Sequence, residues 1–581
     1  SRRRALVYLA ELRIDAARGA SAEEFAQAQR ESAELFDRAR TLQRGSLPAL
    51  HADLAWPDER QGVAFYGLGL YDEAKLLLER ALACRASALR PEHPFTGRTL
   101  YNLACVARVQ RDWVATRDYL ERSLAIRSVS DRPNAIYCLR ELGAVALEFG
   151  DPLGARQWFE RGLALEDELN SSARKRGLLL TDLAGLYTPQ DGPEALKEAL
   201  ARADAALSLL QDSWERSDAF LVRAELRRHV PDPAGMLADL RAAREVLGGG
   251  ADAQRHATLL QSEATVRESS GELEEADGLL RQAIEVMTAT FGADHGGLES
   301  PLYQLAALEF RRGRFEACAR AALRAEAAFQ HEWSRTTRGF EEERLLTLQE
   351  RFSRSLDLAL LAAVRGGRPE LLTEAWEALV AARSQGFEEL RARHEALRRT
   401  KDEHVRALER ELAAARGRLA RAYVASRLAT RPSDELDSAR EERNAAERRL
   451  ALALRDRPEA PSVPKLAALR AALPKGAALI AFAPLAATAE VVSSGGEARQ
   501  GRAERELAAF VLRHDRSEPT VALVLPQELL EARIEKLALL AELGLRVGLR
   551  QAGMELTSTL WEPLARALEG VTLAFVVPAG P

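Results

Sequence analysis

A helical pattern with a period of 39 to 42 residues recurs through residues 51–335, and it limits the possible folds more than any other feature of the sequence. Each copy has an apolar helix, a short turn and a second helix that carries small residues at fixed positions. The two clearest copies, residues 100–126 and 139–165, align so that Ala104 matches Gly143. A unit this short cannot bury its apolar face alone, so successive copies must stack. The pattern therefore predicts a mainly α protein, built on a solenoid of helical pairs.

The turn between the two helices of a copy marks the period. We place the turns at these positions: Gly69, Arg111, Gly150, Asp191, Pro231, Gly271 and Gly313. The copies around Asp191 and Pro231 match the pattern less well and are positioned partly by the period. Residues 51–335 therefore hold about seven units of ~40 residues, and residues 1–50 form an N-terminal helical cap or a degenerate repeat.

The order of large and small residues in these copies resembles the tetratricopeptide repeat. The resemblance implies a superhelical solenoid, in which small residues let the first helix of a repeat approach the second. A plain tetratricopeptide unit has about 34 residues, and HEAT-like units have about 40–47. The excess falls between repeats, at residues 89–97 and 291–300, as in the longer variant of kinesin light chains. A HEAT-like array remains the alternative.

Polar side chains on the first helices of the repeats are candidates for partner binding. Arg98, Asn102 and Arg108 belong to the first helix of one repeat, and Gln304 is the counterpart of Asn102 in the last repeat. In the tetratricopeptide family this face lines a concave groove that often holds peptides. The resemblance therefore implies a protein or peptide ligand on the concave face. A solvated polar face remains the alternative for each residue.

Histidine and cysteine occur without the partners that metal or catalytic sites need. His93 and His295 occupy equivalent loops between repeats, and we expect both to serve as loop and capping residues. We expect no metal and no cofactor. The four cysteines, which lack metal-ligand spacing, indicate reduced thiols and a cytoplasmic protein: Cys84, Cys105, Cys138 and Cys318.

The charge pattern and hydropathy exclude other classes of partner. The net charge is −5, and basic residues alternate with acidic ones instead of forming a basic patch. We therefore expect no nucleic acid as a partner. No apolar run approaches the roughly 18 residues of a membrane span, so we expect no membrane contact. The oligomeric state stays open, and both ends of the chain look truncated.

The second part of the sequence changes from repeats to a connector and then to an α/β segment. Residues 336–457 predict a helical connector, which contains an antiparallel coiled-coil hairpin because apolar residues recur at spacings of three and four. Residues 458–581 alternate strands and helices, which predicts an α/β domain with a partly parallel sheet. We expect strands at residues 478–482, 508–512, 521–525 and 572–577, and helices at residues 527–543 and 555–568.

This order of parts resembles the CHAT proteins, which are bacterial caspase-like domains associated with tetratricopeptide repeats. The family opens its domain with Leu-Pro-x-Gly-x-x-Leu, which Leu473, Pro474, Gly476 and Leu479 match. A later strand of the family ends in Val-Pro-acidic-Gly. Here that strand is followed by Ala579 at the acidic position.

The resemblance implies a cysteine peptidase that works with a His–Cys dyad. In the family both residues lie beyond the Val-Pro strand, where this sequence ends. No cysteine follows Cys318, and His514, the single histidine of residues 458–581, is expected on the surface. We therefore expect the sensor portion of such a peptidase, truncated before the catalytic part, whose repeats bind a partner and regulate the protease domain. The alternative is a non-catalytic interaction scaffold with a vestigial α/β tail.

Overall fold

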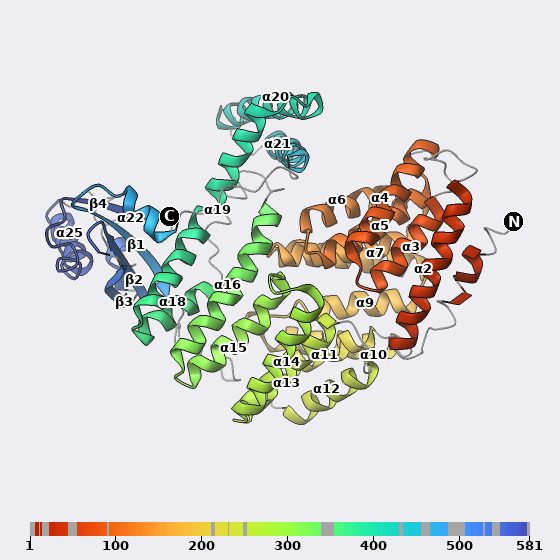
Figure 1. Ribbon diagram of the computed structural model, residues 1–581, viewed down its shortest axis with the longest axis horizontal. Coiled ribbons are helices and arrows are strands. Elements are labelled where there is room, and N and C mark those ends of the chain that lie inside the picture. Colours follow the sequence, from red (N-terminus) through yellow and green to blue (C-terminus); the bar gives the residue numbers. More distant parts are fainter. Residues whose placement is uncertain are drawn as a thin grey trace. The chain divides into compact units, whose positions relative to one another are not determined.

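The computed structural model (Figure 1) describes most of the chain, with gaps. It describes residues 6–10, 12–13, 22–44, 55–89, 92–210, 215–230, 232–247, 253–337, 354–428, 434–454, 465–485, 506–516, 518–526, 529–530, 532–536 and 546–577. The chain divides into two compact units, which are Ser1–Ser270 with Glu285–Thr290, and Gly271–Ile284 with Phe291–Pro581. Among the described residues, no helix is both long and apolar enough to cross a membrane.

Along the described residues, helices follow one another in the sequence as seven successive pairs. We call the first helix of each pair its A helix and the second its B helix. The pairs are α3 (Ala55–Gly67) with α4 (Tyr71–Ala88), α5 (Pro94–Val109) with α6 (Trp113–Ser130), α7 (Arg132–Glu148) with α8 (Pro152–Leu169), α9 (Ala173–Ala184) with α10 (Gly192–Leu209), α11 (Arg216–Arg227) with α12 (Pro233–Leu247), α13 (Ala253–Ser269) with α14 (Leu273–Phe291), and α15 (Glu299–Arg311) with α16 (Phe315–Thr337). Before them, α2 (Ala22–Arg44) packs against α3.

The turns between paired helices share one backbone feature. A residue with positive φ ends the A helix, at Gly69, Gly150, Gly271 and Gly313 and also at Arg111, whose φ is 54°. Glycine adopts this left-handed conformation without the steric cost that a Cβ atom brings. The period predicted these turns correctly.

The two weaker turn assignments are those at Asp191 and Pro231. The turn predicted at Asp191 lies between α9 and α10, but the positive φ of this turn is at the next residue, because Asp191 has φ −72° and Gly192 has φ 83°. Asp191 instead accepts a hydrogen bond from the backbone of Thr188 at 2.8 Å, which stabilises the short turn before α10. Pro231 lies outside the described residues.

Small residues on the A helices receive large residues of the paired B helices, as the register predicted. A Cβ atom added to Gly143 on α7 would lie 2.3 Å from the ring of Phe159 on α8. At the equivalent position of the first pair, a Cβ atom on Gly62 would lie 2.9 Å from Leu78. Because protein interiors are close-packed, the small residue on the A helix determines how closely the two helices approach.

Two of the described helices in residues 336–457 form a packed pair. Helices α20 (Glu403–Leu428) and α21 (Asp434–Ala453) pack against each other. Their shared core contains the predicted seam residues Val405, Leu408, Leu412 and Ala415 from α20 and Ala446 and Leu450 from α21. Charged pairs such as Arg418 with Glu442, at 2.7 Å, lie at the side of this core.

Among the described residues, two helices contact both the last repeat and the α/β segment. Helix α18 (Arg354–Gly366) packs against α16 and against the first strand, and its central residues are fully buried. Helix α19 (Pro369–Arg399) follows after Gly367, whose φ of 64° repeats the turn of the pairs. On α19, Glu377 accepts a hydrogen bond at 2.9 Å from the backbone of Leu466, at the start of α22 (Leu466–Ala472).

The α/β segment forms a four-stranded sheet in the order β3-β2-β1-β4. The strands are β1 (Ala477–Leu485), β2 (Glu506–Arg513), β3 (Thr520–Pro526) and β4 (Leu573–Val577). Strands β1, β2 and β3 pair antiparallel, whereas β4 pairs parallel to β1. A partly parallel sheet was the prediction, and each expected strand is present.

One helix of this segment differs from its prediction. Helix α25 spans Arg546–Leu560, and turns follow it to residue 570, although a helix was expected over residues 555–568. Pro563 explains the early end, because proline lacks a donor N–H and disfavours helical backbone at the preceding residue. The expected helix at residues 527–543 falls largely outside the described residues.

Candidate partner-binding face

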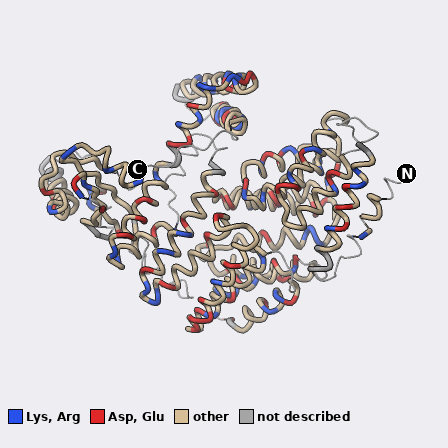
Figure 2. Tube along the Cα trace, viewed as in Figure 1, with Lys and Arg blue, Asp and Glu red and all other residues tan. Residues whose placement is uncertain are grey.

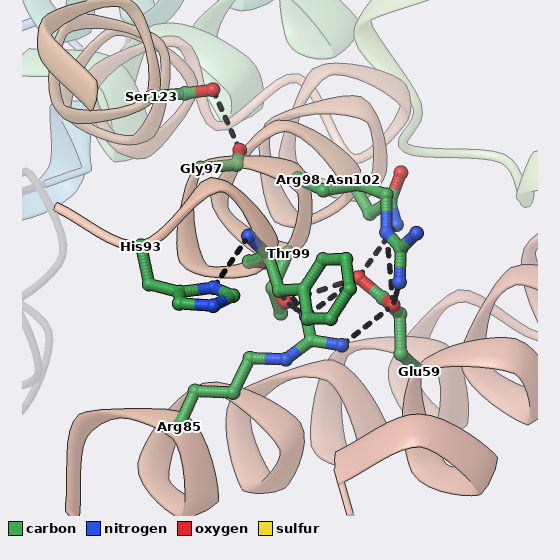
Figure 3. Close-up of polar contacts among 9 residues, drawn as sticks. Glu59, Arg85, His93, Gly97, Arg98, Thr99, Asn102 and Ser123 are labelled. Carbon is green, nitrogen blue, oxygen red and sulfur yellow. Dashed lines mark hydrogen bonds and ion pairs between the residues drawn. The ribbon is translucent and has the colours of Figure 1, made fainter. Parts of the chain in front are cut away.

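A buried carboxylate organises the first predicted partner residues. Glu59 of α3 is 1% exposed and accepts two hydrogen bonds of 2.9 Å from Arg85 of α4. From α5, Arg98 Nε donates to Glu59 at 3.1 Å and Thr99 Oγ1 donates at 3.0 Å. Asn102 Nδ2 completes the group at 3.4 Å. Figure 3 shows these side chains converging on one carboxylate.

Aromatic rings fix the position of Arg98. Its guanidinium lies 4.8 Å from the ring centroid of Trp56 and 5.0 Å from that of Phe95. Cation–π contacts of this kind restrict the rotamers of an arginine that remains partly in solvent. Arg98 is therefore held in place on three sides while its side chain stays 33% exposed.

The charge of Glu59 is retained despite its burial. Burial alone would raise the pKa of Glu59, but the hydrogen bonds and charges of Arg85 and Arg98 outweigh burial, and the pKa is lowered. A buried carboxylate that accepts several charge-assisted bonds stays ionised. Glu59 therefore joins α3, α4 and α5 electrostatically.

Ion pairs between neighbouring A helices continue along the first unit. We call this series the A-helix ladder. It consists of Glu59 with Arg98, Arg108 with Glu141, Arg140 with Asp182, Arg174 with Glu215, and Asp218 with Arg255. Each pair joins the A helix of one repeat, or its first residues, to that of the next.

In the middle of the ladder, one arginine binds both oxygens of a carboxylate. Arg140 of α7 donates to both oxygens of Asp182 on α9, at 2.6 Å and 3.1 Å. Burial raises the pKa of Asp182, and Arg140 offsets only part of that effect. Beside them, Arg108 Nε lies 3.3 Å from Glu141. The charge of Glu141 is the largest cause of the raised pKa of Arg108.

Tyrosines lie between the charged pairs of this face. The rings of Tyr101 on α5 and Tyr137 on α7 are 6.3 Å apart, and Lys175 of α9 lies 5.4 Å from the ring of Tyr137. Burial raises the pKa of the nearby Cys105 thiol to about 12, so this thiol is not a reactive nucleophile at neutral pH. The face offers hydrogen-bonding and aromatic contacts.

The fourth predicted partner residue lies in the other unit. Gln304 belongs to α15 and is half-buried. Its Oε1 atom is buried without a hydrogen-bond partner among the described residues. The structure thus brings Arg98 and Asn102 together on Glu59, places Arg108 on Glu141, and leaves Gln304 as a separate position.

The two loop histidines serve as helix caps, as predicted. His93 Nδ1 accepts a hydrogen bond from the backbone of Phe95 at 3.2 Å. His295 Nδ1 accepts one from Gly297 at 3.1 Å. Within the part of the chain that the structure describes, no group of three or more histidine, cysteine or acidic residues could hold a metal ion.

Sequence reasoning missed the acidic members of the ladder and also Tyr101 and Arg140. Glu59, Tyr101, Arg140 and Asp182 each stand ten residues before a turn residue with positive φ. A polar or aromatic residue at this fixed offset was the available signal. Figure 2 shows acidic and basic residues interleaved along these helices, which hides the pairs in a simple charge plot.

Comparisons with known proteins support the repeat class. A family model described as tetratricopeptide repeat matches residues 53–127 and 99–166, and a second one matches residues 268–296. A search of curated proteins gave no match. The chain therefore contains tetratricopeptide repeats, which suggest an interaction scaffold for proteins and favour this class over the HEAT-like alternative.

Solved structures with similar repeats cover part of the chain. TPR-like repeats of a kinesin light chain from "Podosopora anserina" are 22% identical, with a TM-score of 0.31, over 36% of this chain and 98% of that chain. The apo form of RapI is 12% identical, with a TM-score of 0.38, over 48% and 98%. A Rap protein complexed with competence and sporulation factor is 13% identical, with a TM-score of 0.39, over 58% and 93%.

Proposed function

We propose that the A-helix face of the first unit binds a protein or peptide partner, with Arg98, Asn102 and Arg108 among its contacts. One observation carries this proposal: the ladder fixes these side chains in place while Arg98 and Arg108 remain 33% and 38% exposed. Pre-ordered arginine and tyrosine side chains lose little entropy on binding and are common in interface hot spots. Gln304 is proposed as a contact in the second unit.

The geometry of the array supports a large partner surface. Repeats that stack through their A helices present these helices side by side, and in tetratricopeptide arrays they line the concave face. An extended peptide or a helix can contact several repeats at once on such a surface. Three of the four cysteines are buried and all four are free, which fits the proposed cytoplasmic location.

The test is quantitative co-purification from the source organism. We would compare Asn102→Ala, Arg108→Ala and Gln304→Ala with two control variants on B helices, Val129→Ala and Leu153→Ala, whose side chains are 86% and 73% exposed. We expect the A-helix variants to recover less of the same partner, measured by mass spectrometry. Equal recovery from all five variants would exclude these residues as contacts.

A second proposal concerns the α/β segment: the repeats regulate a caspase-like cysteine peptidase domain, of which residues 458–581 are the first part. The observation that favours it lies at the Leu-Pro-x-Gly motif. Gly476 has φ 76°, and its carbonyl accepts the backbone N–H of Thr572 at 2.8 Å, so the motif joins β1 to the parallel strand β4. A structural role for these residues fits their place in the CHAT pattern.

The coding sequence beyond the codon for Pro581 tests this second proposal. A strand followed by histidine, and a later strand followed by cysteine, would support the peptidase. A stop codon close by, or substitution of both residues, would instead support the non-catalytic scaffold.

A further inference from the structure

We infer that the partner segment on the A-helix face is acidic, with carboxylates that contact partly exposed arginine side chains of the ladder. This inference rests on the proposed function and specifies the chemistry of its partner. It depends on three arginines, which we call the outer arginines: Arg98, Arg108 and Arg174.

The outer arginines are more exposed than the carboxylates beneath them. The side chains of Arg98 and Glu59 are 33% and 1% exposed, and those of Arg174 and Glu215 are 48% and 5% exposed. For Arg108 and Glu141 the values are 38% and 14%. The acidic members of these pairs are therefore more covered than their arginine partners, whose side chains stay partly exposed.

An outer arginine retains donors for a ligand. A guanidinium carries five N–H groups, and the bonds from Arg98 to Glu59 use Nε and Nη2. The Nη1 edge remains for a second acceptor. Because the rings of Trp56 and Phe95 already position Arg98, a carboxylate can form charge-assisted bonds there at little entropic cost.

The same pairs disfavour a nucleic acid. Each outer arginine is matched by a carboxylate, so the face lacks the excess positive charge that a phosphate backbone requires. A discrete carboxylate needs only a local fork of donors, which an arginine supplies with the right geometry. An acidic segment of a protein therefore fits this arrangement better than a nucleic acid.

The test uses fluorescence anisotropy with defined probes on the full chain. The probes are a fluorescein-labelled dodecapeptide of alternating Glu and Gly, the same peptide with Gln in place of Glu, and an oligothymidylate of equal charge. We would measure wild type, Arg98→Gln/Arg174→Gln, and the control Arg117→Gln/Arg122→Gln. The control arginines lie on the B helix α6 and are 34% and 51% exposed.

We expect the Glu peptide to bind wild type more tightly than the other two probes. The double variant on the ladder should weaken Glu-peptide binding about tenfold, as expected from the loss of two charge-assisted contacts. The control variant should bind as wild type does. Circular dichroism checks folding, and if the Gln variant unfolds, Arg98→Lys/Arg174→Lys keeps the charge but removes the fork and should still weaken binding.

Four results would overturn the inference: equal binding of the Gln peptide, equal or tighter binding of the oligothymidylate, equal weakening by the control variant, or no binding of either peptide. If the ladder variant weakens the Glu and Gln peptides alike, the face binds peptides but does not select acidic ones, and the proposed function stands. If neither peptide binds, the co-purification experiment decides separately whether the face has a protein partner.

Discussion

Arg140 on α7 binds both carboxylate oxygens of Asp182 on α9, in the next repeat, at 2.6 Å and 3.1 Å. Both residues stand ten positions before the turn residue of their own repeat, at Gly150 and Gly192. Equivalent positions of neighbouring A helices therefore face each other. The pair is the most regular step of the A-helix ladder.

This geometry predicts an asymmetric response to mutation. Arg140→Met should destabilise the protein by about 2 kcal/mol, because it leaves the partly buried Asp182 without its cation. Arg140→Met/Asp182→Leu should recover much of that loss, since no charge remains unpaired. Urea unfolding followed by circular dichroism measures both. A double variant that is less stable than the single variant would contradict the pairing.

Glu59 should give the protein an acid-sensitive stability. Its pKa is lowered in the folded state from the ordinary value of 4.5, so the stability it contributes is present above pH 4.5 and is lost as the pH falls through the folded-state pKa. Glu59→Gln should therefore be less stable than wild type at neutral pH. The difference in the free energy of unfolding between the two proteins should narrow below about pH 4.5.

Glu263 serves as a control of opposite sign. Burial raises its pKa, so its charged form disfavours the folded state at neutral pH. The stability of wild type relative to Glu263→Gln should therefore increase as the pH falls through the raised pKa. Urea unfolding between pH 3 and pH 7 measures both variants, and the same pH trend in both would contradict the assignment.

At Arg111 we expect glycine to be more stable than alanine, which is the reverse of the order inside a helix. Because its φ is 54°, Arg111→Gly should be more stable than Arg111→Ala by about 1 kcal/mol. Arg122, inside α6, is the matched control, and there Ala should exceed Gly by about 1 kcal/mol. Thermal unfolding of the four variants tests the reversal. The same order at both positions would show that Arg111 is not in the left-handed region.

A side chain at position 476 should destabilise the α/β segment. A Cβ atom there would lie 3.0 Å from Thr572 Oγ1 and would sit on backbone with φ 76°. Gly476→Ala should cost about 1–2 kcal/mol. Gly553 in α25 has open space around its Cβ position, so Gly553→Ala should be neutral or stabilising. Limited proteolysis of the α/β segment, compared between the two variants, checks this difference.

The sequence predicted the parts of the fold that depend on local chemistry. Gly69, Gly150 and Gly313 follow apolar helical segments and adopt positive φ at the turns. The small residue Gly143 marks a close contact between paired helices. Short apolar runs also located each expected strand. Helix α25 was placed too far along the chain because the effect of Pro563 was not weighed.

The sequence could not reveal the ladder, because its partners are about 40 residues apart and their types change from step to step. Glu59 pairs with Arg98, whereas Tyr101, at the position equivalent to Glu59, stacks on Arg127 at 4.7 Å. Only the packing of neighbouring repeats shows which arginine meets which carboxylate. Arg98 and Asn102 were chosen for their polarity, and their common contact with Glu59 was invisible.

Site-specific photo-crosslinking tests the central claim, which is that partners bind the A-helix face, most directly. Benzoylphenylalanine would replace Tyr137 on the A helix α7 and, as the matched control, Leu153 on the B helix α8, in the source organism. We predict a discrete crosslinked partner from Tyr137, which disappears in the Arg98→Gln/Arg174→Gln background, and none from Leu153. The same partner from Leu153 with no product from Tyr137 would contradict the account.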